Sequence, residues 1–181
     1  ITLQPKREVP DISVSMDNWT YGENAKTPRY TMMAGVEATV TYAAQGSSDF
    51  STTVPTDAGN YTVKVQYETA TEIHTGKAEF TIAPKTLTKD DLTYSGPITK
   101  VYDTNTDAPS GLTVFVKPGS LVGSDTLAVS GTLKYNSANV NEANKVTGTV
   151  TLKDTSKVKN YKLPITPYDV SATIAQAATP A

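Results

Sequence analysis

Strict alternation of apolar and polar side chains is the feature that most restricts how this chain can fold. Residues 61–68 read Tyr-Thr-Val-Lys-Val-Gln-Tyr-Glu, and the same period of two returns at residues 36–42, 78–82, 127–135 and 146–153. In an extended strand this period places the apolar set on one face and the polar set on the other. A parallel sheet covered on both faces would instead give continuous apolar runs. The pattern therefore predicts an all-β protein built from antiparallel sheets.

Composition excludes several classes of function. The 181 residues carry a formal net charge of −2 without a lysine- or arginine-rich run, which disfavours nucleic acid as a partner. The chain has no cysteine and one histidine, His74, so neither a thiolate site nor a histidine-rich metal centre can form. No apolar run approaches the roughly 20 residues that span a bilayer. We expect no enzyme activity, cofactor, metal, nucleic-acid partner or membrane span in this segment.

A recurring motif sets the expected domain boundaries. Residues 80–85, Phe-Thr-Ile-Ala-Pro-Lys, resemble residues 1–6 and residues 172–177, and the three copies lie 79 and 92 residues apart. These lengths suit seven-stranded sandwiches, each closed by the repeated strand. We expect the tail of a preceding module or a linker at 1–10, one domain at 11–84, a second at 85–176 and a linker at 177–181.

The connector between the two expected domains is short. Residues 83–86 read Ala-Pro-Lys-Thr. Proline fixes one backbone dihedral, so this connector is predicted to act as a semi-rigid spacer. Neighbouring modules of the same polypeptide are then the expected partners.

The first domain contains a corner motif. Residues 57–61 read Asp-Ala-Gly-Asn-Tyr and resemble the tyrosine corner of immunoglobulin-like domains. The resemblance implies a structural role for Asp57, Gly59 and Tyr61, with the Tyr61 hydroxyl bonded back to nearby backbone. The alternative, Tyr61 as a stacking platform for a ligand, conflicts with its place on the same strand face as Val63 and Val65.

The second domain carries three motifs in order: Lys-Val-Tyr-Asp at 100–103, Val-Gly-Ser-Asp at 122–125 and Asn-Tyr-Lys-Leu at 160–163. Together they resemble the bacterial YDG-type repeats of large surface adhesins, over most of residues 85–176. The first domain is similar to the related bacterial immunoglobulin-like repeats. This resemblance implies structural roles for Tyr102, Asp103 and Tyr161. Thr104 departs from the pattern, because the family has glycine at that place.

The motifs and the period together predict two tandem antiparallel immunoglobulin-like β-sandwich domains joined by a short linker. The resemblance implies a non-enzymatic structural or adhesive repeat of a bacterial cell-surface, cell-wall or secreted protein, and hence an extracellular location. It transfers no catalytic, metal or cofactor-binding residue. A host or glycan ligand stays an open expectation.

Three alternatives stay open. A carbohydrate-binding or accessory module of a secreted polysaccharide-active enzyme would use exposed aromatic residues, with Trp19 and Tyr21 as candidate ligand contacts and Tyr30 and Tyr168 beside them. For Trp19 a strand-edge or core role is favoured over sugar stacking, because tryptophan is largely buried in most proteins. Asp103 and Asp107 have part of the spacing of a calcium loop, against which a solvated turn is favoured. A lysine-to-asparagine crosslink has no residue pair to nominate.

Overall fold

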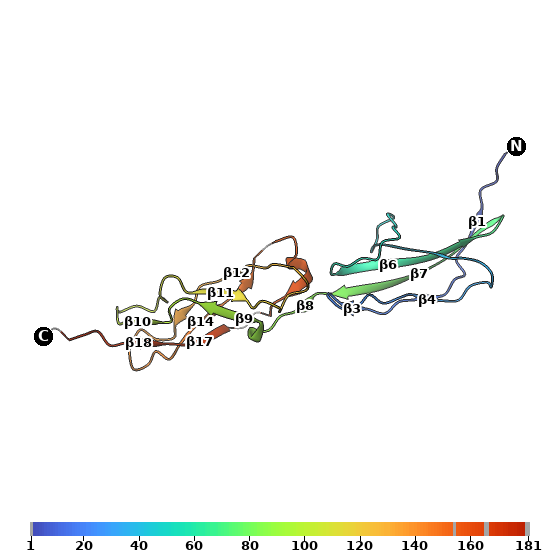
Figure 1. Cartoon of the computed structure of the whole chain (residues 1–181). Coiled ribbons are helices and arrows are strands. Elements are labelled where there is room, and N and C mark those ends of the chain that lie inside the picture. Colours follow the sequence, from blue (N-terminus) through green and yellow to red (C-terminus); the bar gives the residue numbers. More distant parts are fainter. Residues whose placement is uncertain (1, 154, 165–166, 180–181) are drawn as a thin grey trace. The chain divides into compact units, whose positions relative to one another are not determined.

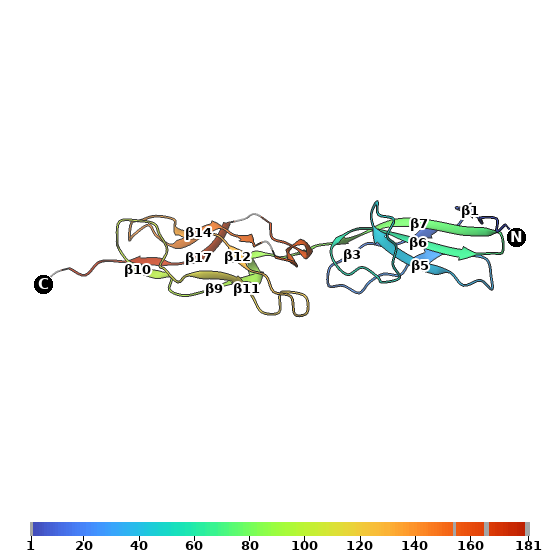
Figure 2. The same cartoon turned by 90° about the horizontal axis from the view of Figure 1, so that it is seen from above.

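The chain is built almost entirely of β-strands in the computed structural model, which describes residues 2–153, 155–164 and 167–179 (Figures 1 and 2). It divides into two compact units, residues 1–85 and 86–181. The described residues contain no α-helix, and none of their helices is long and apolar enough to cross a membrane. The expectation of an all-β protein is confirmed.

The first unit is organised around its longest strand, β7 (Glu72–Ala83). Along one edge β7 pairs antiparallel with β6 (Gly59–Glu68), which pairs in turn with β5 (Thr39–Ala44). Along the other edge β1 (Arg7–Val9) pairs with the beginning of β7 and β3 (Trp19–Thr20) with its end, both in parallel. The sheet is therefore mixed rather than purely antiparallel as predicted. Alternation reports which face of a strand is buried, and it carries no information on the direction of the neighbouring strand.

The segment between β1 and β3 passes close to the backbone of β7. The amide of Ile12 donates to the carbonyl oxygen of Thr75 at 3.1 Å. A Cβ atom at Gly76 would lie 2.0 Å from the carbonyl oxygen of Ile12, so the absence of a side chain at this position permits the contact.

A small second layer covers the sheet of the first unit. β2 (Val14–Ser15) pairs antiparallel with β4 (Arg29–Tyr30) away from the main sheet. Val63 and Val65 of β6 are completely buried, as their alternation predicts. The cluster around Ile12, Val65 and Tyr67 is covered by partly buried apolar side chains from the second layer and from the segment before and within β5: Val14, Tyr30, Met32, Val36, Ala38 and Val40.

The second unit consists of short strands in several small sheets. β8 (Lys85–Thr86) lies at its beginning, and 3₁₀ turns occur at Lys89–Asp91 and Val158–Asn160. The antiparallel partners are β9 (Leu92–Ser95) with β11 (Thr113–Val116), β12 (Val129–Ser130) with β15 (Thr151–Leu152), and β14 (Lys145–Thr149) with both β13 (Lys134–Tyr135) and β17 (Pro167–Ser171). β10 (Thr99–Val101) pairs in parallel with β18 (Thr173–Ala175), and β16 (Tyr161–Lys162) follows the second 3₁₀ turn. One core collects the side chains Leu92, Leu133, Tyr135, Ala143, Val146, Val150, Tyr168, Val170, Ala172 and Ile174.

Two glycines lie where strands of the second unit pass close to each other, and one of them interrupts a strand that the alternation predicted to be continuous. The expected strand 127–135 is divided into β12 and β13 at Gly131, whose φ is +145°. A Cβ atom there would lie 2.5 Å from the carbonyl oxygen of Thr149, and a Cβ atom at Gly148 would lie 2.2 Å from that of Thr132. The two chain segments thus pass each other too closely for side chains. With strands this short, the unit does not form a clear pair of facing sheets of the predicted kind.

Candidate functional site

The corner motif of the first unit fixes a turn. The hydroxyl of Tyr61 donates to the carbonyl oxygen of Asp57 at 2.8 Å. A Cβ atom at Gly59 would lie 3.3 Å from the Tyr61 ring, which explains the small residue between them. The ring of Tyr61 stacks on Phe80 with 5.6 Å between centroids. This is the backbone contact of a tyrosine corner, and it leaves Tyr61 half-buried against the core.

Three of the four aromatic residues considered as ligand contacts lie in the interior, and the fourth, Tyr30, is half-buried. Trp19 is 5% exposed and stacks on Phe80, with ring centroids 5.1 Å apart and an interplanar angle of 16°. Tyr21 and Tyr168 are buried as well. These three rings therefore form no exposed stacking platform, and Trp19 is a core residue.

The motif at the beginning of the second unit is arranged around the ammonium group of Lys100. Its Nζ atom lies 2.8 Å from Oδ1 of Asp103 and donates to the backbone carbonyl and side-chain oxygens of Asn105, at 2.9 Å each. The Tyr135 ring lies below it, 5.3 Å from Nζ to the centroid. The hydrogen bond from Lys100 lowers the pKa of Asp103. The motif therefore folds its own loop around one charge.

Thr104 sits at the strained point of this loop. It has a φ of +72° and is the one non-glycine residue with positive φ in the described part of the chain. A β-branched residue in this left-handed region is a genuine outlier. The place where the family pattern has glycine is thus a place where the backbone favours glycine.

The other residues of the loop have different environments. The side chain of Tyr102 is 41% exposed, while its amide donates to the carbonyl oxygen of Ala175 at 2.9 Å. Asp103 pairs with Lys100, and Asp107 pairs with Lys134 at 2.9 Å. The two carboxylates considered for calcium thus each contact a lysine.

Tyr161 joins the other two motifs of the second unit. Its buried hydroxyl donates to Oδ2 of Asp125 at 2.7 Å and accepts the amide hydrogen of Val122 at 2.8 Å. Residues 122–125 and 160–163, which are far apart in sequence, therefore meet at one hydroxyl group. Both motifs contribute to a single internal contact.

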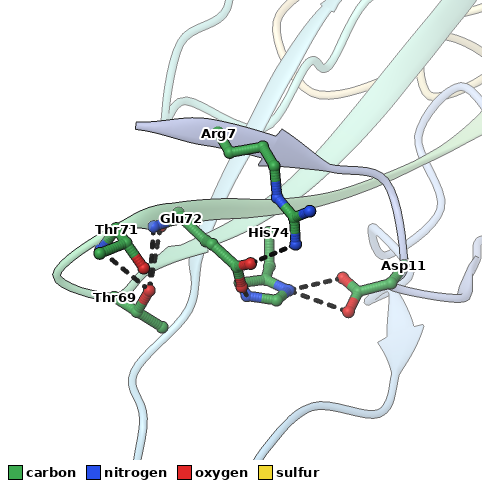
Figure 3. Close-up of polar contacts among 6 residues, drawn as sticks. All are labelled: Arg7, Asp11, Thr69, Thr71, Glu72 and His74. Atoms are coloured by element: carbon green, nitrogen blue, oxygen red, sulfur yellow. Dashed lines mark hydrogen bonds and ion pairs between the residues drawn. The ribbon is translucent and has the colours of Figure 1, made fainter. Parts of the chain in front are cut away.

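A polar cluster in the first unit surrounds His74 (Figure 3). Nδ1 of His74 lies 2.8 and 2.9 Å from the two carboxylate oxygens of Asp11, and Nε2 lies 2.9 Å from Oε2 of Glu72. Arg7 donates to the other oxygen of Glu72. Both ring nitrogens thus face carboxylates, an arrangement that fits the doubly protonated imidazolium because each nitrogen then donates.

The environment of His74 favours its charged form. The ring is buried and stacks on Tyr67 with 4.5 Å between centroids. The hydrogen bond to Asp11 raises the pKa of His74, burial opposes the shift, and Glu72 adds to it. The hydrogen bond from Arg7 lowers the pKa of Glu72. The cluster links Arg7 of β1 and Asp11 to Glu72 and His74 of β7.

Sequence reasoning missed this cluster. Glu72 and His74 are two residues apart on one strand, so alternation places them on the same face. Nothing local connects them to Asp11, which lies 63 residues from His74. Among the described residues, no group of three or more acidic, histidine or cysteine side chains has the arrangement of a metal site.

Comparison with known families identifies the second unit. The model of the YDG domain matches residues 83–179, more than half of the chain. The chain therefore belongs to the YDG domain family, whose members are repeat modules. Searches of curated proteins and of solved structures gave no match. The match begins at residue 83, so the immunoglobulin-like repeat at 11–84 stays a prediction.

Proposed function

We propose that this chain is a pair of non-enzymatic immunoglobulin-like modules that act as semi-rigid structural or display units of a bacterial cell-surface or secreted protein. The observation that carries the proposal is that side chains of the motif residues form hydrogen bonds and ion pairs within their own unit. Tyr161 holds Val122 and Asp125, and Lys100 holds Asp103 and Asn105. The polar groups of the YDG-type motifs are engaged in fixing loops, which is the work of a scaffold.

Two features of the first unit support its assignment as an immunoglobulin-like module. The bond from Tyr61 to Asp57 has the form of a tyrosine corner. The β2–β4 pair and the segment that follows it pack on the buried face of the main sheet around Val65 and Tyr67, giving two layers. A mixed sheet edge with β1 and β3 beside β7 is compatible with such a module.

The connector supports the semi-rigid part of the proposal. β7 ends at Ala83 and β8 begins at Lys85, so Pro84 is the one residue between them. Its φ is fixed by the pyrrolidine ring. Few backbone dihedrals are free at this joint, as a spacer in an array of modules requires.

The alternative, a carbohydrate-binding accessory module with Trp19 and Tyr21 as its platform, has little support. Trp19 packs on Phe80, and Tyr21 is buried. A ligand would therefore have to bind elsewhere on the chain. The structural proposal implies an extracellular location, and it implies that the partners are neighbouring modules of the same polypeptide. Both statements depend on that proposal.

Pulsed electron–electron double resonance, which measures the distance between two spin labels, tests the proposal. The chain contains no cysteine, so Thr56→Cys and Lys117→Cys, both at exposed positions, would place one spin label in each unit without removing native thiols. A semi-rigid spacer gives one narrow distance distribution. A distribution as broad as that of a flexible tether would contradict the spacer role.

A further inference from the structure

Two lysines face each other on the outer side of the first sheet. Lys64 of β6 and Lys77 of β7 are direct partners in the antiparallel ladder. Lys64 lies between the buried residues Val63 and Val65, so its side chain points away from the core. Like charges directly opposite each other destabilise a sheet. The fold alone gives no reason for this pair.

The two ammonium groups lie near one aromatic ring. Nζ of Lys64 is 4.2 Å from the centroid of the Phe50 ring, and Nζ of Lys77 is 5.5 Å from it. In the part of the chain that the structure describes, no carboxylate forms an ion pair with either group. The ring offsets part of the repulsion through cation–π attraction. It neutralises neither charge, so a local positive potential remains.

A surface cavity of about 420 Å³ lies beside the ring. This is within the range of small-ligand sites. Its walls come from the loop that ends at Phe50, from β6 and from β7, and consist of Gly46, Ser47, Phe50, Thr62, Lys77, Ala78 and Glu79. Lys64 is not part of these walls and adjoins the cavity through its contact with the Phe50 ring. The hydroxyl groups of Ser47 and Thr62 are hydrogen-bonding groups suited to sugar hydroxyls. Glu79 is the one acidic residue in this wall.

We propose that Phe50, Lys64 and Lys77 form a binding site for an acidic sugar residue of a glycan. The two ammonium groups would bind its carboxylate or sulfate by charge-assisted hydrogen bonds. Phe50 would hold the two ammonium groups beside the cavity by cation–π attraction, and the hydroxyl groups of the sugar would reach Ser47 and Thr62. An anion between Lys64 and Lys77 would remove the repulsion that the empty site carries. This inference goes beyond the spacer role, which does not depend on it.

The charge balance favours one acidic sugar over nucleic acid. The cavity itself is lined by one cation, Lys77, and one carboxylate, Glu79; Lys64 adds a second cation at the Phe50 ring, and the whole chain has a net charge of −2. A nucleic acid needs a long row of cations to contact successive phosphates.

Titration of the full chain with galacturonate hexamers tests the proposal, with a sulfated heparin hexasaccharide as a second probe and maltohexaose as the neutral probe. We expect saturable binding of one or both acidic probes, amide chemical-shift changes at Gly46, Ser47 and Thr62, and no binding of maltohexaose. The two acidic probes distinguish a carboxylate from a sulfate as the recognised group. Absence of binding by both, or equal binding of the neutral sugar, would overturn the proposal.

Matched variants separate the site from general charge. Lys64→Gln with Lys77→Gln is expected to weaken binding by at least about tenfold, as the loss of charge-assisted bonds requires. The charge-matched control, Lys26→Gln with Lys117→Gln at exposed positions, is expected to bind as the unmodified chain does. Phe50→Leu keeps both cations and is expected to weaken binding through loss of the ring. Equal effects of the two double variants would contradict the site, and so would equal affinity for single-stranded DNA of the same charge. Circular dichroism confirms that each variant is folded.

Discussion

The hydroxyl of Tyr161 donates to the carboxylate of Asp125 at 2.7 Å and accepts the amide hydrogen of Val122 from the same loop. One buried oxygen atom thus holds a turn of four residues against β16. The two hydrogen bonds fix the position of the loop at residues 122–125. It makes the second unit sensitive to the loss of a single atom.

Tyr161→Phe is expected to lower the free energy of unfolding of the second unit by about 1–2 kcal/mol, because it leaves the half-buried amide of Val122 without its acceptor. Circular dichroism during urea unfolding measures the change. Tyr102→Phe is the matched control, since its side chain is 41% exposed, and it is expected to leave stability unchanged. The fluorescence of Trp19, the single tryptophan, should report an unaltered first unit in both variants. Equal stability of the two variants would contradict the role of Tyr161.

Thr104→Gly is expected to stabilise the second unit by about 1 kcal/mol, because glycine adopts positive φ without the steric cost that a β-branched residue pays at +72°. Thermal unfolding measures the gain. Thr106→Gly, at a nearby residue without positive φ, should instead destabilise the unit by about 0.5–1 kcal/mol through added chain entropy. A loss of stability in Thr104→Gly would contradict this expectation. It would show that the threonine side chain stabilises the unit by more than its positive φ destabilises it.

Gly76→Ala is expected to destabilise the first unit by more than about 2 kcal/mol, because its Cβ would lie 2.0 Å from the Ile12 carbonyl oxygen and the segment between β1 and β3 would have to move. Gly46→Ala provides a scale. It has a φ of +81° and open space around it, so its cost is limited to about 1 kcal/mol of backbone strain. Urea unfolding followed by Trp19 fluorescence compares them. Equal losses of stability in the two variants would mean that the backbone near Ile12 can move away from the added methyl group without a large loss of stability.

The cluster around His74 predicts a dependence of stability on pH. The pKa of His74 is raised above its ordinary value of 6.5, so its contribution is complete below pH 6.5 and is lost as pH rises through the raised value. The pKa of Glu72 is lowered from 4.5, so its contribution is present above pH 4.5 and is lost as pH falls through the lowered value. The cluster therefore stabilises the first unit most between pH 4.5 and 6.5.

Unfolding followed by Trp19 fluorescence at pH 5.5 and pH 8.5 measures this dependence. The first unit is expected to be more stable at pH 5.5, with His74→Gln removing most of the difference. Glu142→Gln, in the second unit, is the control and should leave the difference in place. A first unit that is more stable at pH 8.5 would contradict the paired state of His74.

Local sequence patterns were sufficient to predict strand faces and short-range hydrogen bonds in this structure. The alternation around Val63 and Val65 predicted which face of β6 is buried, because that pattern is local to one strand. The motif at 57–61 predicted a back-bond from Tyr61, and the structure has that bond to Asp57. Both features are contained within a few consecutive residues.

Contacts between distant segments could not be predicted in this way. Strand register and chain crossing bring distant residues together, and alternation specifies neither of them. The pairs that meet in this way are Asp11 with His74, Tyr161 with Asp125, and Lys64 with Lys77. The break at Gly131 and the close approach at Gly148 have the same origin, because each glycine lies against the backbone of another segment. The sequence favoured a strand-edge or core role for Trp19, and its packing partner Phe80 became clear only with β3 placed beside β7.

The most direct test of the spacer account is the distance distribution between spin labels at Thr56→Cys and Lys117→Cys, compared with the same pair after insertion of a glycine–serine octapeptide between Pro84 and Lys85. The account predicts a narrow distribution for the native joint and a markedly broader one after the insertion, because the inserted residues add free dihedrals. Equally broad distributions in the two proteins would contradict it.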